Sequence, residues 1–141
     1  MANLDRFVNA QAAIYDQVVD ELSSGKKKGH WMWFIFPQLR GLGRSQNAER
    51  FGIRDLEEAR DYLEHPVLGP RLEECTNLVL RFSHLPMEAV FGPLDALKLR
   101  SSMTLFRTPE GAPTVFGTVL EQCFDNETCR FTDERLERSP T

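Results

Sequence analysis

A run of six consecutive apolar residues, Trp31 to Phe36, constrains the fold more than any other feature of the sequence. The run contains no polar residue, so hydrophobic periodicity does not distinguish a buried strand from a short buried helix. Pro37 ends the segment in either case, because the residue before a proline is disfavoured in the α conformation. We favour a helix, since the chain has no second strand-like run with which a strand could pair. The run is also too short to span a bilayer.

Helical periodicity dominates the rest of the chain. Apolar residues recur at spacings of three and four within segments 7–22, 56–63, 68–82, 94–106 and 115–123. Gly25 is placed to end the first of these helices, and Asp55 and Glu58 form a capping box for the second. Ser45 is placed to cap a further short helix that reaches Phe51.

These segments predict a single all-α domain of six or seven mostly short helices over residues 1–131. Pro66 is expected as the first residue of the helix that contains Leu68. A short helix over 86–91 should end at Gly92 and Pro93. Residues 132–141 are charged and lack a clear apolar stripe, so they are expected to form a frayed tail.

The net charge and the cysteine content argue against some classes of protein. The formal net charge is −4 and the sequence pI is about 5.4, which argues against a dedicated nucleic-acid binder. The three cysteines, Cys75, Cys123 and Cys129, are odd in number and lack CxxC spacing, as is typical of a reducing compartment. The first residues lack the basic and apolar regions of a signal peptide. We therefore expect a cytoplasmic protein without membrane contact, and the composition sets no oligomeric state.

The segment 94–106 carries the most informative polar pattern. At about 100° per residue, Asp95, Lys98 and Ser102 form a narrow stripe between two apolar faces, while Arg100 marks the exposed side. If both apolar faces are packed, the stripe faces the protein or a cleft, and its charges need partners. Asp95 and Lys98 are therefore the candidate catalytic residues. The alternative is an ordinary ion pair on a solvated edge.

A glycine-containing turn, from Arg40 to Ser45, is a second candidate site. Gly41 and Gly43 allow backbone amides to converge on an anion, and a helix after Ser45 would add free amides. Arg40 and Arg44 would supply positive charge to a phosphate, with Lys28 as a further source. The alternative is that the turn is a plain connector.

The aromatic run supplies a third group of candidates. In a short helix, Trp31 and Trp33 point in different directions, so one indole is available to stack on a base or another flat ligand. His30 and Gln38 flank the run with polar groups that packing does not require. The alternatives are core packing for the indoles and a capping or solvent-exposed position for His30.

Several standard sites are absent from the sequence. There is no HExxH, Walker A or GxSxG motif and no paired Cys and His spacing. His30, His65 and His84 are scattered along the chain, so we expect no metal site and no resident cofactor.

The chain resembles a bacterial family of unknown function, some of whose members are labelled calpastatin. The resemblance rests on the long motif from Gly29 to Leu39 and on the turn from Gly41 to Ser45, and it covers roughly residues 4–128. It continues through segments 65–69, 91–92 and 101–106, and through Asp95 with Lys98. Gly29 stands where the family pattern has Ser, and Phe51-Gly52 stands where it has Tyr-Ala. This resemblance implies a small helical domain without a known activity.

A looser resemblance is to the helical superfamily associated with NAD and ADP-ribose, which includes N-glycosidases. It rests on size, helical class and an aromatic-rich segment that precedes a lysine-containing helix. The combined hypothesis is binding of a phosphorylated nucleoside-type molecule, ADP-ribose-like, with hydrolysis of an N-glycosidic bond as its catalytic form. In that form Asp95 activates water or stabilises positive charge on the ribose, Lys98 orients Asp95 or the phosphate, and Ser102 binds the sugar. The alternative function is a non-catalytic protein-interaction module anchored by the aromatic run, so the sequence leaves enzymatic activity open.

Overall fold

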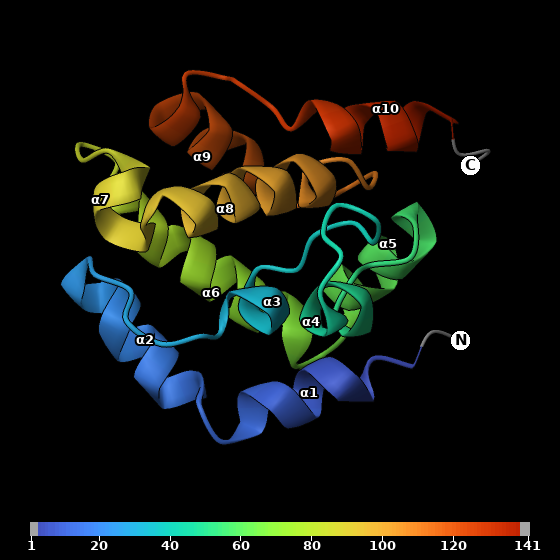
Figure 1. The fold of residues 1–141 in the computed structure, drawn as a ribbon, viewed down its shortest axis with the longest axis horizontal. Coiled ribbons are helices and arrows are strands. Elements are labelled where there is room, and N and C mark those ends of the chain that lie inside the picture. The colour runs from blue at the N-terminus through green and yellow to red at the C-terminus, as the bar shows by residue number, and fades with distance from the viewer. Residues whose placement is uncertain (1–2, 139–141) are drawn as a thin grey trace.

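The computed structural model describes residues 3–138, and this part of the chain contains ten helices (Figure 1). In chain order they are α1 (Asp5–Ala12), α2 (Tyr15–Ser24), α3 (Met32–Ile35), α4 (Gln46–Arg50), α5 (Leu56–Glu64), α6 (Leu68–Leu80), α7 (Met87–Phe91), α8 (Pro93–Phe106), α9 (Val115–Phe124) and α10 (Arg130–Arg138). The described residues include no strand, and one isolated parallel bridge joins Leu39 to Ile53. None of these helices combines the length and the apolar character that crossing a membrane requires. One mostly helical domain is confirmed, but the predicted number of six or seven helices is wrong.

The segment 7–22 forms two helices where one was predicted. The chain leaves the helical conformation at Ile14, where φ is −125° and ψ is −9°. The side-chain amide of Gln11 donates to the carbonyl of Phe34 at 2.8 Å and to the hydroxyl of Tyr62 at 3.2 Å. These contacts fix the last turn of α1 against other helices. Because no glycine or proline marks the break, the local pattern does not reveal it.

Helix α8 crosses the molecule with α9 and α10 on one side and α3 on the other (Figure 1). Leu99, Met103 and Phe106 on α8 are fully buried. The Phe106 ring lies 5.2 Å from the Tyr62 ring and 6.0 Å from the Phe116 ring, measured between centroids. Burial of large aromatic side chains here supplies much of the hydrophobic stabilisation of the domain.

The predicted exposure of α8 is wrong at its first two turns. Leu94 and Leu97 were expected to pack, yet they are 73% and 53% exposed. Arg100 was expected to mark the exposed side, but it is half-buried and its Nη1 lies 3.4 Å from Oε2 of Glu127. Helix α8 begins at the edge of the bundle beside α7, so the outer side of its first turns meets solvent (Figure 1).

The charged C-terminal segment is helical through residue 138, so the predicted frayed tail from Thr132 is wrong for this range. Three hydrogen bonds join the start of α10 to α8. The Ser101 hydroxyl donates to Sγ of Cys129 at 3.2 Å and lies 3.4 Å from the hydroxyl of Thr132, which is fully buried. The amide of Cys129 donates to the Thr104 hydroxyl at 3.0 Å. Residues 139–141 of the predicted tail lie outside the described residues.

Most predicted helix ends are confirmed. Asp55 accepts a hydrogen bond from the amide of Glu58 at 2.9 Å, and Gly25 ends α2 with φ of 74°. Pro66, however, lies in a turn before α6 and is not its first residue. The imidazole Nδ1 of His65 accepts hydrogen bonds from the amides of Val67 and Leu68 at 3.1 and 3.3 Å, so a histidine caps this helix.

Candidate functional site

The carboxylate of Asp95 lies between two lysines in the first turn of α8. Its Oδ1 accepts a hydrogen bond from Nζ of Lys98 at 3.1 Å, as the spacing allows. Its Oδ2 lies 2.7 Å from Nζ of Lys27, which the sequence did not single out. Lys27 belongs to the loop between α2 and α3, and its amide donates to the carbonyl of Val90 on α7 at 2.9 Å. The ion pair therefore joins the loop after α2 to α8, and the backbone hydrogen bond joins the same loop to α7.

This carboxylate is held in its ionised form. Burial raises the pKa of Asp95, but the hydrogen bonds and charges of Lys27 and Lys98 outweigh burial and lower the pKa below its ordinary value. The Lys27 side chain is 6% exposed and that of Asp95 21%, so solvent reaches one side of the pair. A carboxylate with a lowered pKa is a poor general base.

Trp33 lies between this ion pair and the glycine turn. The Nζ of Lys98 is 4.0 Å from the centroid of the Trp33 ring, a cation–π contact. On another side of the indole, a Cβ placed on Gly43 would lie 3.8 Å from Cη2 of Trp33. Trp33 is half-buried and packs against the hydrophobic core. The structure thus brings Lys98 and Gly43, two predicted site residues, against one aromatic side chain.

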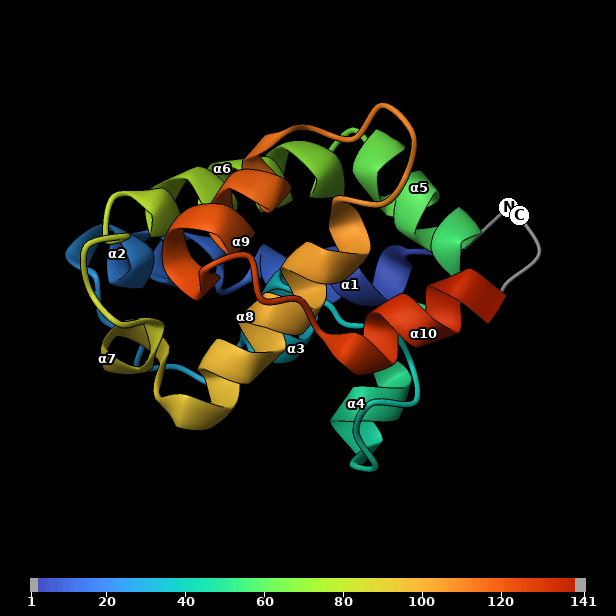
Figure 2. The ribbon, with the colours of Figure 1, turned by 90° about the horizontal axis from the view of Figure 1, so that it is seen from above.

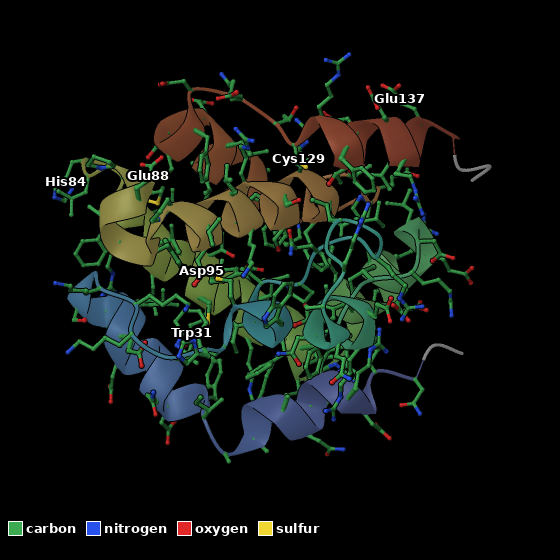
Figure 3. All side chains as sticks on the ribbon, viewed as in Figure 1. Trp31, His84, Glu88, Asp95, Cys129 and Glu137 are labelled. Atoms are coloured by element: carbon green, nitrogen blue, oxygen red, sulfur yellow. The ribbon has the colours of Figure 1, made fainter. Side chains whose placement is uncertain are left out.

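Trp31 belongs to the core. It is fully buried, and its indole N–H donates to Oε1 of Glu21 at 3.0 Å. The same oxygen accepts from the amides of Lys28 and Gly29 at 2.6 and 2.8 Å. Figure 3 shows Trp31 and Asp95 close together beneath α8, and Nζ of Lys27 lies 5.0 Å from the Trp31 ring centroid. Without an exposed face, Trp31 offers a ligand nothing to stack on, which favours the core-packing alternative.

Glu21 is the polar residue that the sequence analysis missed in this region. Burial raises the pKa of its carboxyl, but the hydrogen bonds from the amides of Gly29 and Lys28 outweigh burial and hold the pKa at about 2. The side chains of Gln17 and Trp31 add further hydrogen bonds. Its position on α2 resembled that of any surface glutamate. The role of Glu21 is visible only in the folded structure, where the loop after α2 folds back against this helix.

The glycine turn borders an open surface hollow of about 580 Å³. It is lined by Arg40, Gly41, Gly43, Gln46, Glu49 and Arg50. The backbone of the turn is anchored by hydrogen bonds from the amide of Arg40 to Ile53 at 2.7 Å and from the amide of Ile53 to Gln38 at 2.8 Å. Gly41 has φ of 103°, a conformation that favours glycine. Arg50 lines the hollow together with the predicted residues. It was not predicted, because it lies beyond the turn at the end of α4.

The short helix after the turn contributes less than the sequence suggested. The hydroxyl of Ser45 accepts a hydrogen bond from the amide of Ala48 at 3.1 Å, so this serine is engaged as a helix cap. Helix α4 has only five residues. The positive charge beside the hollow therefore comes from arginine side chains and not from the amides of α4.

Ser102, His30 and Gln38 are predicted site residues that do not line the hollow. Ser102 is fully buried, and its hydroxyl has no hydrogen-bond partner in the part of the chain that the structure describes. It shares the helical stripe of Asp95 and Lys98 but lies deeper. His30 is exposed next to the aromatic run. Gln38 is half-buried, and its carbonyl belongs to the bridge with Ile53.

The hollow has unpaired positive charge. Within residues 3–138, no carboxylate forms an ion pair with Arg40, Arg44 or Arg50. Glu49 is the one carboxylate in the lining. No group of three or more His, Cys, Asp or Glu side chains in the described range is arranged to hold a metal ion. The site thus consists of an arginine-lined hollow, the half-buried Trp33 and the Lys27–Asp95–Lys98 cluster.

The sequence of this helical domain matches the model of a protein family. The chain belongs to the family described as "Protein of unknown function (DUF1810)", whose model matches residues 1–136. The sequence-based assignment to a family of unknown function is thereby confirmed.

One solved structure is closely similar to this chain. It is the crystal structure of the conserved hypothetical protein Rv1873 from Mycobacterium tuberculosis, with 51% sequence identity and a TM-score of 0.94. The alignment covers 96% of this chain and 97% of that chain. No curated protein matches the chain. The TM-score shows that this structural relative shares the fold of the chain.

Proposed function

We propose that this protein binds a phosphorylated nucleoside-type small molecule, with ADP-ribose as the model ligand. The observation that carries the proposal is the position of Trp33, which contacts Lys98 of the ion-pair cluster and borders Gly43 of the arginine-lined hollow. A ligand that fills the hollow therefore has an aromatic ring and a charged cluster within reach. The looser resemblance to the NAD and ADP-ribose superfamily supports the same class of ligand.

The phosphate group is assigned to the hollow. Arg40 and Arg50 line it, Arg44 follows Gly43 in the turn, and guanidinium groups bind phosphate through paired hydrogen bonds. The volume of about 580 Å³ lies within the range of small-molecule sites.

The nucleoside part is assigned to Trp33 and the ion-pair cluster. The half-buried indole offers a surface for stacking on a base. In the catalytic form of the proposal, Asp95 stabilises positive charge on the ribose as the N-glycosidic bond breaks, and Lys98 orients Asp95. Both oxygens of Asp95 contact lysines, which disfavours activation of water by this carboxylate.

Binding is tested by thermal shift and calorimetry with ADP-ribose, NAD, ADP and adenosine. A ligand at about 100 times its dissociation constant stabilises the folded state by roughly 2.7 kcal/mol. We expect ADP-ribose to bind and adenosine to bind at least tenfold more weakly, since adenosine lacks phosphate. Arg40→Ala and Trp33→Leu should each weaken ADP-ribose binding, whereas Arg81→Ala, an exposed arginine outside the hollow, should not. Absence of binding across the panel refutes the proposal.

Catalysis is tested separately by chromatographic detection of the released base. Asp95→Asn should abolish release from NAD or another N-glycoside while binding persists, because the amide lacks the charge. Binding without release by the wild type would restrict the function to ligand binding.

The alternative function is a protein-interaction module anchored by the aromatic run. The exposure of this run does not support it. Trp31, Met32, Ile35 and Phe36 are buried. Among the described residues the exposed large hydrophobic side chains are Leu85, Leu94 and Leu97, none of them aromatic. An interaction module of this kind needs a contiguous exposed aromatic patch.

A further inference from the structure

Helix α10 brings another arginine to the glycine turn. A Cβ placed on Gly41 would lie 3.4 Å from Nη1 of Arg135 and 3.5 Å from Cζ of Phe131, both on α10. Figure 2 shows α10 next to the loop that leads into α4, although the two segments are far apart in the sequence. The guanidinium of Arg135 thus lies next to Gly41, which lines the hollow, although Arg135 is not itself among the lining residues.

The position of Arg135 is set by the packing of α10. The start of this helix is joined to α8 through the hydrogen bonds of Cys129 and Thr132 to Ser101 and Thr104. The guanidinium also lies 5.5 Å from the centroid of the Phe131 ring, one turn earlier. An arginine held on a docked helix loses less conformational freedom on binding than one in a loose tail.

Positive charge consequently meets the hollow from two segments of the chain. Arg40 and Arg50, from the glycine turn and α4, line the hollow; Arg44 follows the lining residue Gly43, and Arg135 of α10 lies beside Gly41. Like the other three, Arg135 forms no ion pair within residues 3–138. Glu49 opposes them as the single carboxylate of the lining. In a chain of net charge −4, this is a local concentration of unpaired cations that matches a polyanion.

We propose that Arg135 is a ligand-binding residue and that the hollow takes a diphosphate group in preference to a monophosphate. This inference rests on the proposed function and specifies the chemistry of its ligand. Two guanidinium groups in paired geometry can bind the oxygens of a single phosphate. A diphosphate has a second charged group that reaches from the turn to Arg135.

The test measures binding of inorganic phosphate, pyrophosphate and ADP by calorimetry. The proteins are the wild type, Arg135→Ala, Arg135→Gln and Arg130→Ala. Arg130 is the matched control, because it lies on the same helix, is 91% exposed and pairs with Glu134 away from the turn. Since Arg135 is itself exposed, its replacement should leave the fold intact, which circular dichroism verifies.

The wild type should bind pyrophosphate about tenfold more tightly than phosphate. Both Arg135 variants should lose about tenfold in pyrophosphate and ADP affinity with little change for phosphate, while Arg130→Ala binds as the wild type does. Equal affinity of the Arg135 variants and the wild type for pyrophosphate would overturn the role of Arg135 and leave the proposed function standing. Equal affinity of the wild type for phosphate and pyrophosphate overturns the diphosphate preference. Failure of the wild type to bind any of these anions or ADP-ribose removes both proposals.

Discussion

The Nζ atom of Lys27 lies 2.7 Å from Oδ2 of Asp95, and this contact joins the loop after α2 to the first turn of α8. The same ammonium group lies 5.0 Å from the centroid of the buried Trp31 ring and also donates to the carbonyl of Gly29. Lys27 thereby connects the loop, the core and the candidate site, so its replacement should affect all three.

Lys27→Met should lower the free energy of unfolding at pH 7 by about 1–3 kcal/mol, between the values for surface and buried ion pairs. The lowered pKa of Asp95 stabilises the fold at pH values above its unfolded pKa of about 4, and this contribution is lost as the pH falls through the folded-state pKa. The variant should therefore show a shallower loss of stability in acid. Urea denaturation between pH 3 and pH 7 measures both effects. Lys26→Met, at an exposed neighbouring position, is the control, and an equal loss in the two variants contradicts the assignment.

Glu21→Gln should destabilise the protein by about 2 kcal/mol at neutral pH, because two backbone amides and an indole N–H would lose a charged acceptor. The folded-state pKa of about 2 lies below the ordinary carboxyl value, so the stabilisation is complete above about pH 5 and is lost as the pH falls toward 2. Denaturation curves at several pH values test this sign. Asp20→Asn, an exposed change on the same helix, should have little effect.

The two tryptophans should respond differently to truncation. Trp31→Ala should cost about 3–5 kcal/mol, because it leaves a cavity in the core and removes a donor from Glu21. Trp33→Ala should cost roughly half as much, because the indole is only half-buried. Guanidinium denaturation compares them directly. If Trp33→Ala proved the more damaging to stability, Trp33 would be a core residue and the proposed stacking surface would be lost.

Gly41→Ala and Gly111→Ala should each cost about 1 kcal/mol, since both glycines have positive φ, 103° and 80°. A Cβ at Gly111 meets no atom within 4 Å, whereas one at Gly41 approaches Arg135 and Phe131. Only Gly41→Ala should therefore weaken binding of ADP-ribose or pyrophosphate. Thermal melts give the stabilities and calorimetry the affinities. Weakened binding in both variants would point to a general loss of stability.

Features that depend on residues close in the sequence were predicted correctly, whereas features that depend on distant contacts were missed. The Ser45 and Asp55 caps and the left-handed Gly25 depend on neighbours within one helical turn, and all three were predicted. The pairing of Asp95 with Lys98 is equally local. The break near Ile14 and the order of α10 were missed, because they depend on contacts made by Gln11 and Ser101 with distant segments.

The same distinction holds for the candidate site. The sequence by itself determined the helical class, the glycine turn and the polar stripe of α8, because periodicity, capping and backbone freedom are properties of short stretches of chain. Only the tertiary structure decided that Trp31 is fully buried while Trp33 is half-buried, and that Lys27 and Arg135 lie next to Asp95 and Gly41. These groups are far apart in the chain, and the packing of the helices against one core places them side by side.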